Sequence, residues 1–137
     1  MSAVIFDTGV IIGSLLSADQ HHNRCEKFMR EFKGTRLLPV TVFSETLGML
    51  ERWPNAEAAF VASVRERFFV LVQLVDDDLI RIEELVKQYG DFPLGGVDAS
   101  IIAIAERLHI DTVTTIDHRH FRAVVPHHVA ALTLVPA

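Results

Sequence analysis

Short apolar runs alternate along the chain with longer stretches in which apolar residues repeat at helical spacing. Runs rich in β-branched and aromatic residues predict buried strands at about residues 3–6, 37–40, 69–74, 112–116 and 130–135. Between them, apolar residues recur three and four positions apart, which predicts helices over about residues 19–32, 41–50, 54–68, 76–89 and 97–108. The expected caps agree with these bounds, since Thr41 can begin one helix and Gly90 can end another.

The regular alternation of strands and helices predicts an α/β fold. Strands that are joined through helices lie parallel, so we expect a three-layer α/β/α sandwich around a mostly parallel sheet of about five strands. The length of 137 residues, with no linker-like stretch, predicts one domain over residues 1–137. In such sheets, ligands bind beyond the carboxyl ends of the strands, at the point where the strand order reverses.

Four acidic residues are each embedded among apolar neighbours. Asp7 follows the first predicted strand and Asp117 follows the fourth, so both are expected at the carboxyl edge of the sheet. Asp98 lies in the first turn of a predicted helix, and Glu45 lies one turn into another. A carboxylate in apolar surroundings is costly unless it binds a metal or carries a proton. Four of them, with no buried Lys or Arg beside them, predict a site for a divalent metal.

The chemistry of such a site follows from its ligands. Carboxylate oxygens suit the hard ions Mg²⁺ and Mn²⁺, and these ions can activate a water and steady the charge of a phosphodiester during in-line displacement. Each acid also has a simpler explanation: Asp7 and Asp117 could cap turns, Asp98 could complement a helix dipole, and Glu45 could face solvent. Thr115 should point to the same side as Asp117, where it could hold a water or a ligand carboxylate, or simply fill a strand position.

The seven histidines raise the question of zinc, because several stand in pairs such as His21-His22, His118-x-His120 and His127-His128. No pair has the helical spacing with a glutamate that zinc proteases show, and no cysteine pair accompanies them. The sequence therefore disfavours a structural zinc site.

Composition narrows the class of protein further. Half of the residues are hydrophobic and 23% are charged, which argues against disorder. No apolar run approaches the roughly 18 residues of a membrane helix, and Asp7 interrupts the N-terminal apolar run that a signal peptide would need. The single Cys25 cannot form an intramolecular disulfide, so a reducing cytoplasm is the expected compartment. The net charge of −5 argues against a nucleic-acid partner, although residues 118–128 contain two arginines, four histidines and no acid.

Taken together, these segments resemble the PIN-domain ribonucleases, and more narrowly the VapC-type toxins of bacterial toxin–antitoxin pairs. The resemblance covers essentially the whole chain, and its matching stretches are Val4 to Thr8 with Val10 to Ile12, Ser44 to Thr46, Asp91 to Leu94, Val97 to Ala103, and Thr115 to Phe121. The stretches around Asp98 and Asp117 are the most specific.

The resemblance implies a metal-dependent endoribonuclease with Asp7, Glu45, Asp98 and Asp117 as its acidic constellation, and it implies the same PIN-like α/β/α fold. It also implies a homodimer held inactive by a small antitoxin protein. Asp91 would be a secondary acid near the site.

Three expectations about partners follow. RNA would be hydrolysed with a metal-activated water, and Arg119 and Arg122 would contact its phosphates beside the metal. The antitoxin would place apolar anchors in grooves between helices and a Lys or Arg on the carboxylates. The expected anchor positions are near Phe28, Phe32, Leu47 and Leu50.

Two alternatives from other classes remain open. The chain could be a PIN-like binding module without catalysis, which the presence of all four acids argues against. Asp7-Thr8 after a first strand also resembles the start of a phosphoaspartate enzyme, such as a haloacid-dehalogenase-type phosphatase. That family has a second Asp two residues later, where this chain has Gly9.

Overall fold

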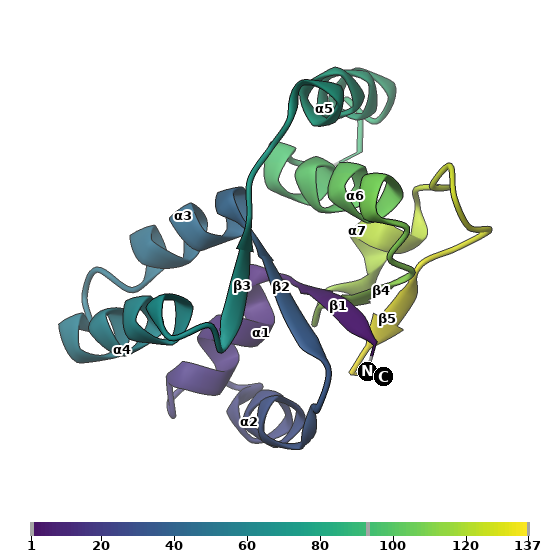
Figure 1. The fold of residues 1–137 in the computed structure, drawn as a ribbon. Coiled ribbons are helices and arrows are strands. Elements are labelled where there is room, and N and C mark those ends of the chain that lie inside the picture. The colour runs from purple at the N-terminus through teal and green to yellow at the C-terminus, as the bar shows by residue number, and fades with distance from the viewer. Residues whose placement is uncertain (1, 93, 137) are drawn as a thin grey trace.

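The computed structural model describes residues 2–92 and 94–136 and contains one five-stranded sheet (Figure 1). The strands are β1 (Ala3–Phe6), β2 (Thr35–Pro39), β3 (Phe69–Val72), β4 (Thr112–Thr114) and β5 (Thr133–Val135). Their order in the sheet is β3-β2-β1-β4-β5, and every neighbouring pair is parallel. The predicted α/β fold with a mostly parallel sheet of about five strands is therefore confirmed.

Seven helices occur within the described part of the chain. They are α1 (Thr8–Leu15), α2 (His22–Glu31), α3 (Val40–Met49), α4 (Pro54–Arg65), α5 (Asp76–Gln88), α6 (Gly96–Leu108) and α7 (His118–Arg122). Among residues 2–92 and 94–136, none of the helices is both long and apolar enough to cross a membrane.

Two of these helices, α1 and α7, are not in the sequence prediction. Helix α1 carries Val10, Ile11 and Ile12 in succession, all buried, so its sequence has no polar face to reveal the helical period. Helix α7 has only five residues, which is too short for a periodic pattern.

Several predicted boundaries also move. Helix α3 begins at Val40, after Pro39, and the hydroxyl of Thr41 lies 2.6 Å from Ser100 Oγ instead of capping the helix. Strand β4 ends at Thr114, two residues earlier than expected, although the Thr115 N–H still donates to the Val135 carbonyl at 2.8 Å. Strand β5 begins at Thr133 rather than at residue 130. Pro93, part of one family-like stretch, lies outside the described residues.

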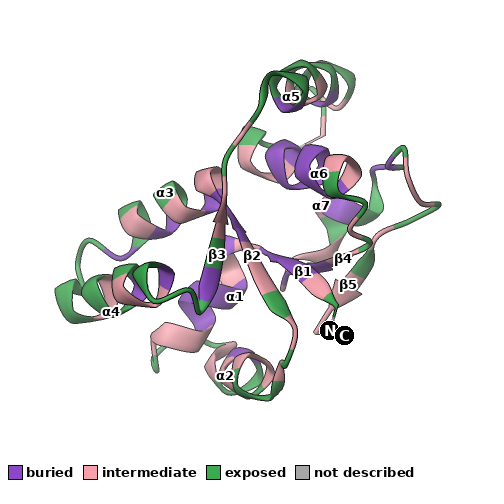
Figure 2. Cartoon of the chain, viewed as in Figure 1, coloured by how far each residue is buried: buried purple, intermediate pink, exposed green. Residues whose placement is uncertain are grey.

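The helices form two layers on the sheet, with α1 to α4 on one side and α5 to α7 on the other (Figure 1). On the first side, the ring of Phe6 from β1 contacts the rings of Phe28 and Phe32 from α2, with centroids 6.2 and 5.7 Å apart. On the second side, residues 99–105 of α6 are all buried, which Figure 2 shows as a nearly continuous buried helix beneath α5. The core thus lies on both faces of the sheet, as parallel sheets require.

The strand order places a functional position at one edge. Strand β1 has β2 on one side and β4 on the other, so the chain direction across the sheet reverses between β1 and β4. In open parallel sheets the crevice at this point, beyond the carboxyl ends of the strands, is where ligands bind. Asp7 follows β1 directly, and Asp117 lies three residues after β4.

Candidate active site

Asp7 is the most deeply buried of the four predicted acids, and two neighbours hold it. Its Oδ1 accepts a hydrogen bond from the Thr8 N–H at 2.8 Å, which makes Asp7 the N-cap of α1. Its Oδ2 accepts from the buried hydroxyl of Thr115 at 3.0 Å. The same Thr115 oxygen also accepts from the Asp117 N–H at 3.2 Å. Thr115 therefore connects the ends of the two strands that flank the reversal point.

Glu45 reaches the site from α3 although its side chain is largely exposed. The hydroxyl of Thr8, which is buried, donates to Glu45 Oε1 at 2.5 Å. Thr8 therefore uses its backbone N–H for Asp7 and its hydroxyl for Glu45. These two carboxylates, 38 residues apart in the sequence, are thereby joined through one residue.

Asp98 lies in the first turn of α6 and is contacted by a histidine. Its Oδ2 is 3.1 Å from Nδ1 of His120, which comes from α7. The other ring nitrogen, Nε2, lies 3.8 Å from Asp117 Oδ2. The imidazole of His120 therefore stands between two of the predicted acids.

Of the two acids beside His120, Asp117 is more exposed than Asp98. Its Oδ1 accepts from the Arg119 N–H at 3.2 Å and caps α7, and the Arg119 guanidinium lies 3.5 Å from the same oxygen. Arg122 is also exposed and contacts His118 at 3.3 Å. Both arginines are thus at the surface beside the acids, and their predicted contact with RNA stays a prediction.

The pKa values show that the four carboxylates share one electrostatic environment. Burial raises the pKa of Asp7 to about 6, with a further rise from the charges of Asp98 and Glu45 that hydrogen bonds from Thr8 and Thr115 oppose. Burial also raises the pKa of Asp98, where His120 opposes the shift and the charges of Glu45 and Asp117 add to it. The pKa of Asp98 is therefore raised by a carboxylate from α3 and by another from the turn between β4 and α7.

Asp117 responds in the opposite direction. Its slight burial raises its pKa, but the hydrogen bonds from Arg119 and the charges of His120 and Arg119 outweigh that effect and hold the pKa below its usual range. The surroundings of Asp117 thus favour its ionised form, in contrast to those of Asp7 and Asp98.

The donors at this edge suit a hard divalent cation. Within residues 2–92 and 94–136, no three His, Cys, Asp or Glu side chains stand close enough together to enclose one ion. Mg²⁺, however, is commonly held by one or two carboxylates and keeps several waters. Asp7 and Asp98 meet that requirement, since both are partly buried, neither has a Lys or Arg ion pair among the described residues, and the charge of Asp98 raises the pKa of Asp7. The residues therefore fit the implied metal.

The other candidates from the sequence do not join the site. Asp91 is exposed and has no side-chain hydrogen bond or ion pair in the described part of the chain. His22 Nδ1 lies 2.8 Å from the Gly13 carbonyl oxygen, and His128 Nε2 lies 2.6 Å from that of Ile110. His120, in contrast, contacts Asp98 and lies near Asp117, although the sequence predicts no role for it. Its position three residues after Asp117, on one helix face, is the signal that could have identified it.

Comparison with known proteins agrees with the family resemblance and with the fold. A family model described as the PIN domain matches residues 4–125, which confirms the family resemblance of the sequence. Among the curated proteins, no relative matches this sequence.

Solved structures share the fold at low identity. VapC20 of Mycobacterium tuberculosis, described as a toxin that cleaves the sarcin–ricin loop, is 18% identical with a TM-score of 0.79 over 93% of this chain and 98% of that chain. A toxin–antitoxin complex from Klebsiella pneumoniae is 19% identical, with a TM-score of 0.67 over 88% and 92% of the two chains. A DNA-bound VapBC from Salmonella typhimurium is 16% identical, with a TM-score of 0.66 over 98% and 97%.

Proposed function

We propose that this chain, which belongs to the PIN domain family, is a metal-dependent endoribonuclease that acts as the toxin of a toxin–antitoxin pair. The observation that carries the proposal is the electrostatic coupling of Asp7, Glu45, Asp98 and Asp117 at the reversal point of the sheet. The similar structures support it, because one is described as a toxin that cleaves the sarcin–ricin loop and another as a toxin–antitoxin complex.

Asp7 and Asp98 would hold the cation, with Glu45 and Asp117 adding ligands or charge. A bound Mg²⁺ or Mn²⁺ would supply Lewis acidity toward a phosphate oxygen and ease deprotonation of the attacking water. The chain's own groups do the rest of the work. Thr115 and the Thr8 N–H fix the orientation of Asp7, and its pKa of about 6 leaves it mostly ionised at neutral pH. No covalent intermediate is required.

The exposed arginines beside Asp117 would bind the RNA backbone. Arg119 and Arg122 stand one turn apart on α7, so their guanidinium groups can reach successive phosphates. Phosphate contacts of this kind position a nucleic acid without selecting its sequence.

The test is cleavage of total RNA by the purified, partner-free protein with Mg²⁺ or Mn²⁺. Asp98→Asn should abolish cleavage, whereas Asp91→Asn, which removes an exposed carboxylate outside the site, should not. Cleavage that survives Asp98→Asn would contradict the assignment. A folded wild type that leaves RNA intact would favour the binding-module alternative, and hydrolysis of a simple phosphomonoester instead would favour the phosphatase alternative.

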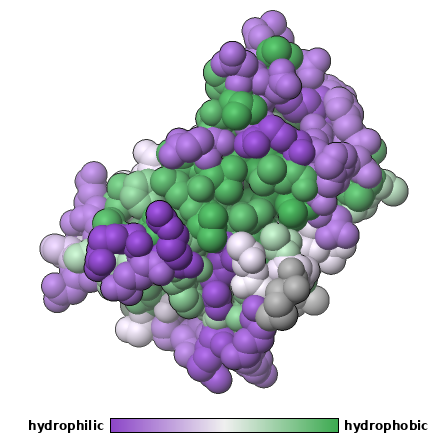
Figure 3. All heavy atoms as spheres, in the orientation of Figure 1, coloured by the Kyte–Doolittle hydropathy of each residue, from purple (hydrophilic) through white to green (hydrophobic). Residues whose placement is uncertain are grey.

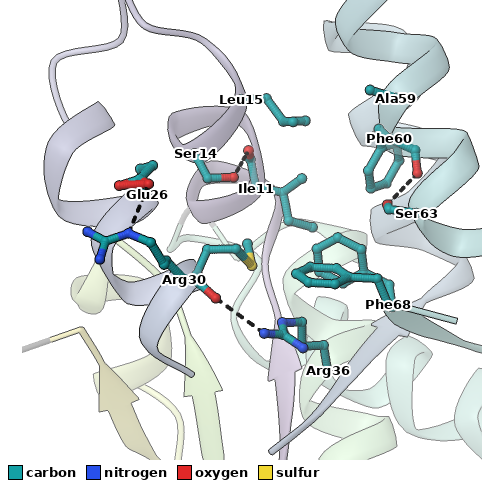
Figure 4. A pocket seen from close by; sticks show the side chains of 12 residues that line it. Ile11, Ser14, Leu15, Glu26, Arg30, Arg36, Ala59, Phe60, Ser63 and Phe68 are labelled. Atoms are coloured by element: carbon teal, nitrogen blue, oxygen red, sulfur yellow. Dashed lines mark hydrogen bonds and ion pairs between the residues drawn. The ribbon is translucent and has the colours of Figure 1, made fainter. Parts of the chain in front are cut away.

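We place the antitoxin at a pocket of about 410 Å³ between α1, α2 and α4 (Figure 4). Its apolar lining includes Ile11, Leu15, Met29, Phe60 and Phe68. The anchors expected from the sequence are different, and one of them, Leu50, is wrong because it is fully buried. An amphipathic helix that inserts apolar side chains fits a pocket with this lining.

Arg36 gives the pocket a charge preference. Its guanidinium lies 3.9 Å from the centroid of the Phe68 ring and donates to the Phe32 carbonyl at 2.9 Å. Its Nε is buried without a hydrogen-bond partner, and among the described residues it pairs with no carboxylate. The docked helix should therefore carry an Asp or Glu beside its apolar residues.

This docking can be measured with the small protein encoded next to this chain. Phe68→Glu should weaken the complex at least tenfold, because it puts a charge in the pocket; Val125→Glu, at a position that is exposed elsewhere, is the matched control. Equal affinity of the two variants would remove the pocket from the interface.

For the homodimer, we propose the outer face of α5 as the interface. Val75, Leu79 and Val86 recur at helical spacing and are 42%, 53% and 40% exposed, with Ile82 between them. Figure 3 shows hydrophobic atoms on α5 and a broad hydrophobic area near the edge strand β3. An antiparallel pairing of two α5 helices would also bring Asp76 at the start of one helix near Lys87 at the end of the other.

A further inference from the structure

Each predicted acid has a partner that fixes its carboxylate. Thr115 and the Thr8 N–H hold Asp7, the Thr8 hydroxyl holds Glu45, and the Arg119 N–H holds Asp117. For Asp98, the partner within the described residues is His120, through Nδ1 and Oδ2 at 3.1 Å. Asp98 Oδ1 has no hydrogen-bond partner there and is free for another ligand.

The ring of His120 is itself held in place from two sides. Phe92 meets it edge-on, with the ring centroids 5.8 Å apart and the ring planes at 85°. The next residue, Phe121, is buried and anchors α7 in the core. Only 23% of the His120 side chain is exposed, so the imidazole has little freedom to leave Asp98.

The geometry also fixes which nitrogen carries the proton. A carboxylate only accepts hydrogen bonds, so Nδ1 must be the donor to Asp98 Oδ2. Nε2 lies 3.8 Å from Asp117 Oδ2, beyond a direct hydrogen bond but close enough for a water to bridge the two. The ring of His120 thereby lies between the carboxylate of Asp98 at the start of α6 and that of Asp117 at the start of α7.

We propose that His120 is a positioning residue that orients Asp98 for the metal. This inference rests on the proposed metal-dependent function. Nδ1–H occupies Oδ2 of Asp98 and leaves Oδ1 for a cation, and it fixes this carboxylate as Thr115 and the Thr8 N–H fix that of Asp7. Partners that hold metal-binding carboxylates in this way typically change metal affinity or activity by about 10- to 100-fold when they are removed.

The experiment compares three substitutions of His120 in the full chain. Asn places its amide nitrogen where the imidazole has Nδ1, Gln places it where the imidazole has Nε2, and Ala removes both. Mn²⁺ binding is measured by calorimetry without RNA, and the thermal unfolding of the metal-free proteins is recorded in parallel. His120→Ala and His120→Gln should bind Mn²⁺ about tenfold more weakly, whereas His120→Asn should recover most of the affinity.

A merely structural histidine would give a different pattern, because affinity would then follow unfolding temperature rather than the position of the amide nitrogen. His127→Ala is the control, since this ring is 68% exposed and lies beside Glu106 at the other end of α6. In RNA cleavage, His120→Ala should raise the Mn²⁺ concentration for half-maximal rate by the same factor as the loss of affinity.

Several results would overturn the proposal. One is Mn²⁺ binding by His120→Ala that is unchanged or tighter than in the wild type. Another is an equal Mn²⁺ affinity of folded His120→Asn and His120→Gln. This comparison tests the proposal even if His120→Ala fails to fold. A wild type that binds no Mn²⁺ overturns it as well. A wild type that binds Mn²⁺ through His120 but leaves RNA intact removes only the proposed function.

Discussion

Asp7→Asn should stabilise the metal-free protein at neutral pH. The substitution keeps the shape of the side chain and an oxygen for the Thr8 N–H, and its amide can donate to the Thr115 hydroxyl. It removes a charge that burial and the neighbouring acids Asp98 and Glu45 disfavour. Because other carboxylates repel this charge, removing it should raise the free energy of unfolding of the metal-free protein, although it removes a predicted metal ligand.

The size of the effect follows from the pKa. In the folded protein the pKa of Asp7 is about 6, against an ordinary value of 3.8. Because the folded pKa is raised, this group contributes full stability below about pH 4 and loses it as the pH rises through about 6. At 1.36 kcal/mol per pH unit, the loss above that window is about 3 kcal/mol at most. The Asn variant lacks this term, so its advantage should appear across the same window.

The assay is urea denaturation in EDTA at several pH values between about 4 and about 8, followed by the fluorescence of Trp53, the single tryptophan. The two proteins should be equally stable near pH 4 and differ by about 2–3 kcal/mol near pH 7.5. Asp91→Asn, which removes an exposed carboxylate, should show no such divergence. A variant that is less stable than the wild type at neutral pH, or offset equally at all pH values, would refute the reasoning. Saturating Mn²⁺ should then favour the wild type instead.

The remaining predictions concern the surface and one buried ion pair. Replacing both Arg119 and Arg122 by Ala should weaken RNA binding for all sequences and flatten the slope of log affinity against log salt by about 0.7 for each lost phosphate contact, measured by fluorescence anisotropy at several salt concentrations. Asp78→Ala should cost about 3 kcal/mol of unfolding free energy in urea, because Asp78 is 2% exposed and its partner Arg107, at 3.0 Å, would lose its charge partner. Leu79→Glu should convert a dimer to a folded monomer in light scattering, and an unchanged mass would exclude the α5 interface.

Much of the fold can be predicted from the sequence because the residues that favour a strand or helix locally are also those that pack in the core. Strand β1 was predicted to the residue, since Ala3–Phe6 is a short β-favouring run that is buried between helices. Helix α1 was not, because Val10, Ile11 and Ile12 face apolar surroundings on every side and erase the amphipathic period. The spacing of apolar residues reveals a helix only where one face of that helix is exposed to solvent.

The sequence predicts that the acids meet because Asp7 and Asp117 follow strands, Asp98 begins a helix, and parallel strands end at one edge of the sheet. Among the residues that hold them, Thr115 could be proposed from its place two residues before Asp117, but Thr8 and His120 could not. Thr8 and Glu45 are 37 positions apart and His120 and Asp98 are 22 apart, so only the packing of α3 and α7 against the sheet makes these contacts. Sequence patterns specify where an element begins, whereas such pairings depend on how the elements pack.

Two of the acids, Asp7 and Asp117, are also helix N-caps, and this second role affects which substitutions the protein can accept during evolution. Asp7 and Asp117 cap α1 and α7 through side-chain oxygens, a role that Asn or Ser performs nearly as well. A single Asp-to-Asn change at either position would therefore remove the proposed chemistry while retaining the cap, whereas Ala would also cost about 1 kcal/mol of helix stability. Under the proposed toxin function, cells selected to survive expression of this chain should thus accumulate polar replacements at positions 7 and 117. If the proposed nuclease function holds, one substitution of this kind would convert the chain to an inactive protein with the same fold.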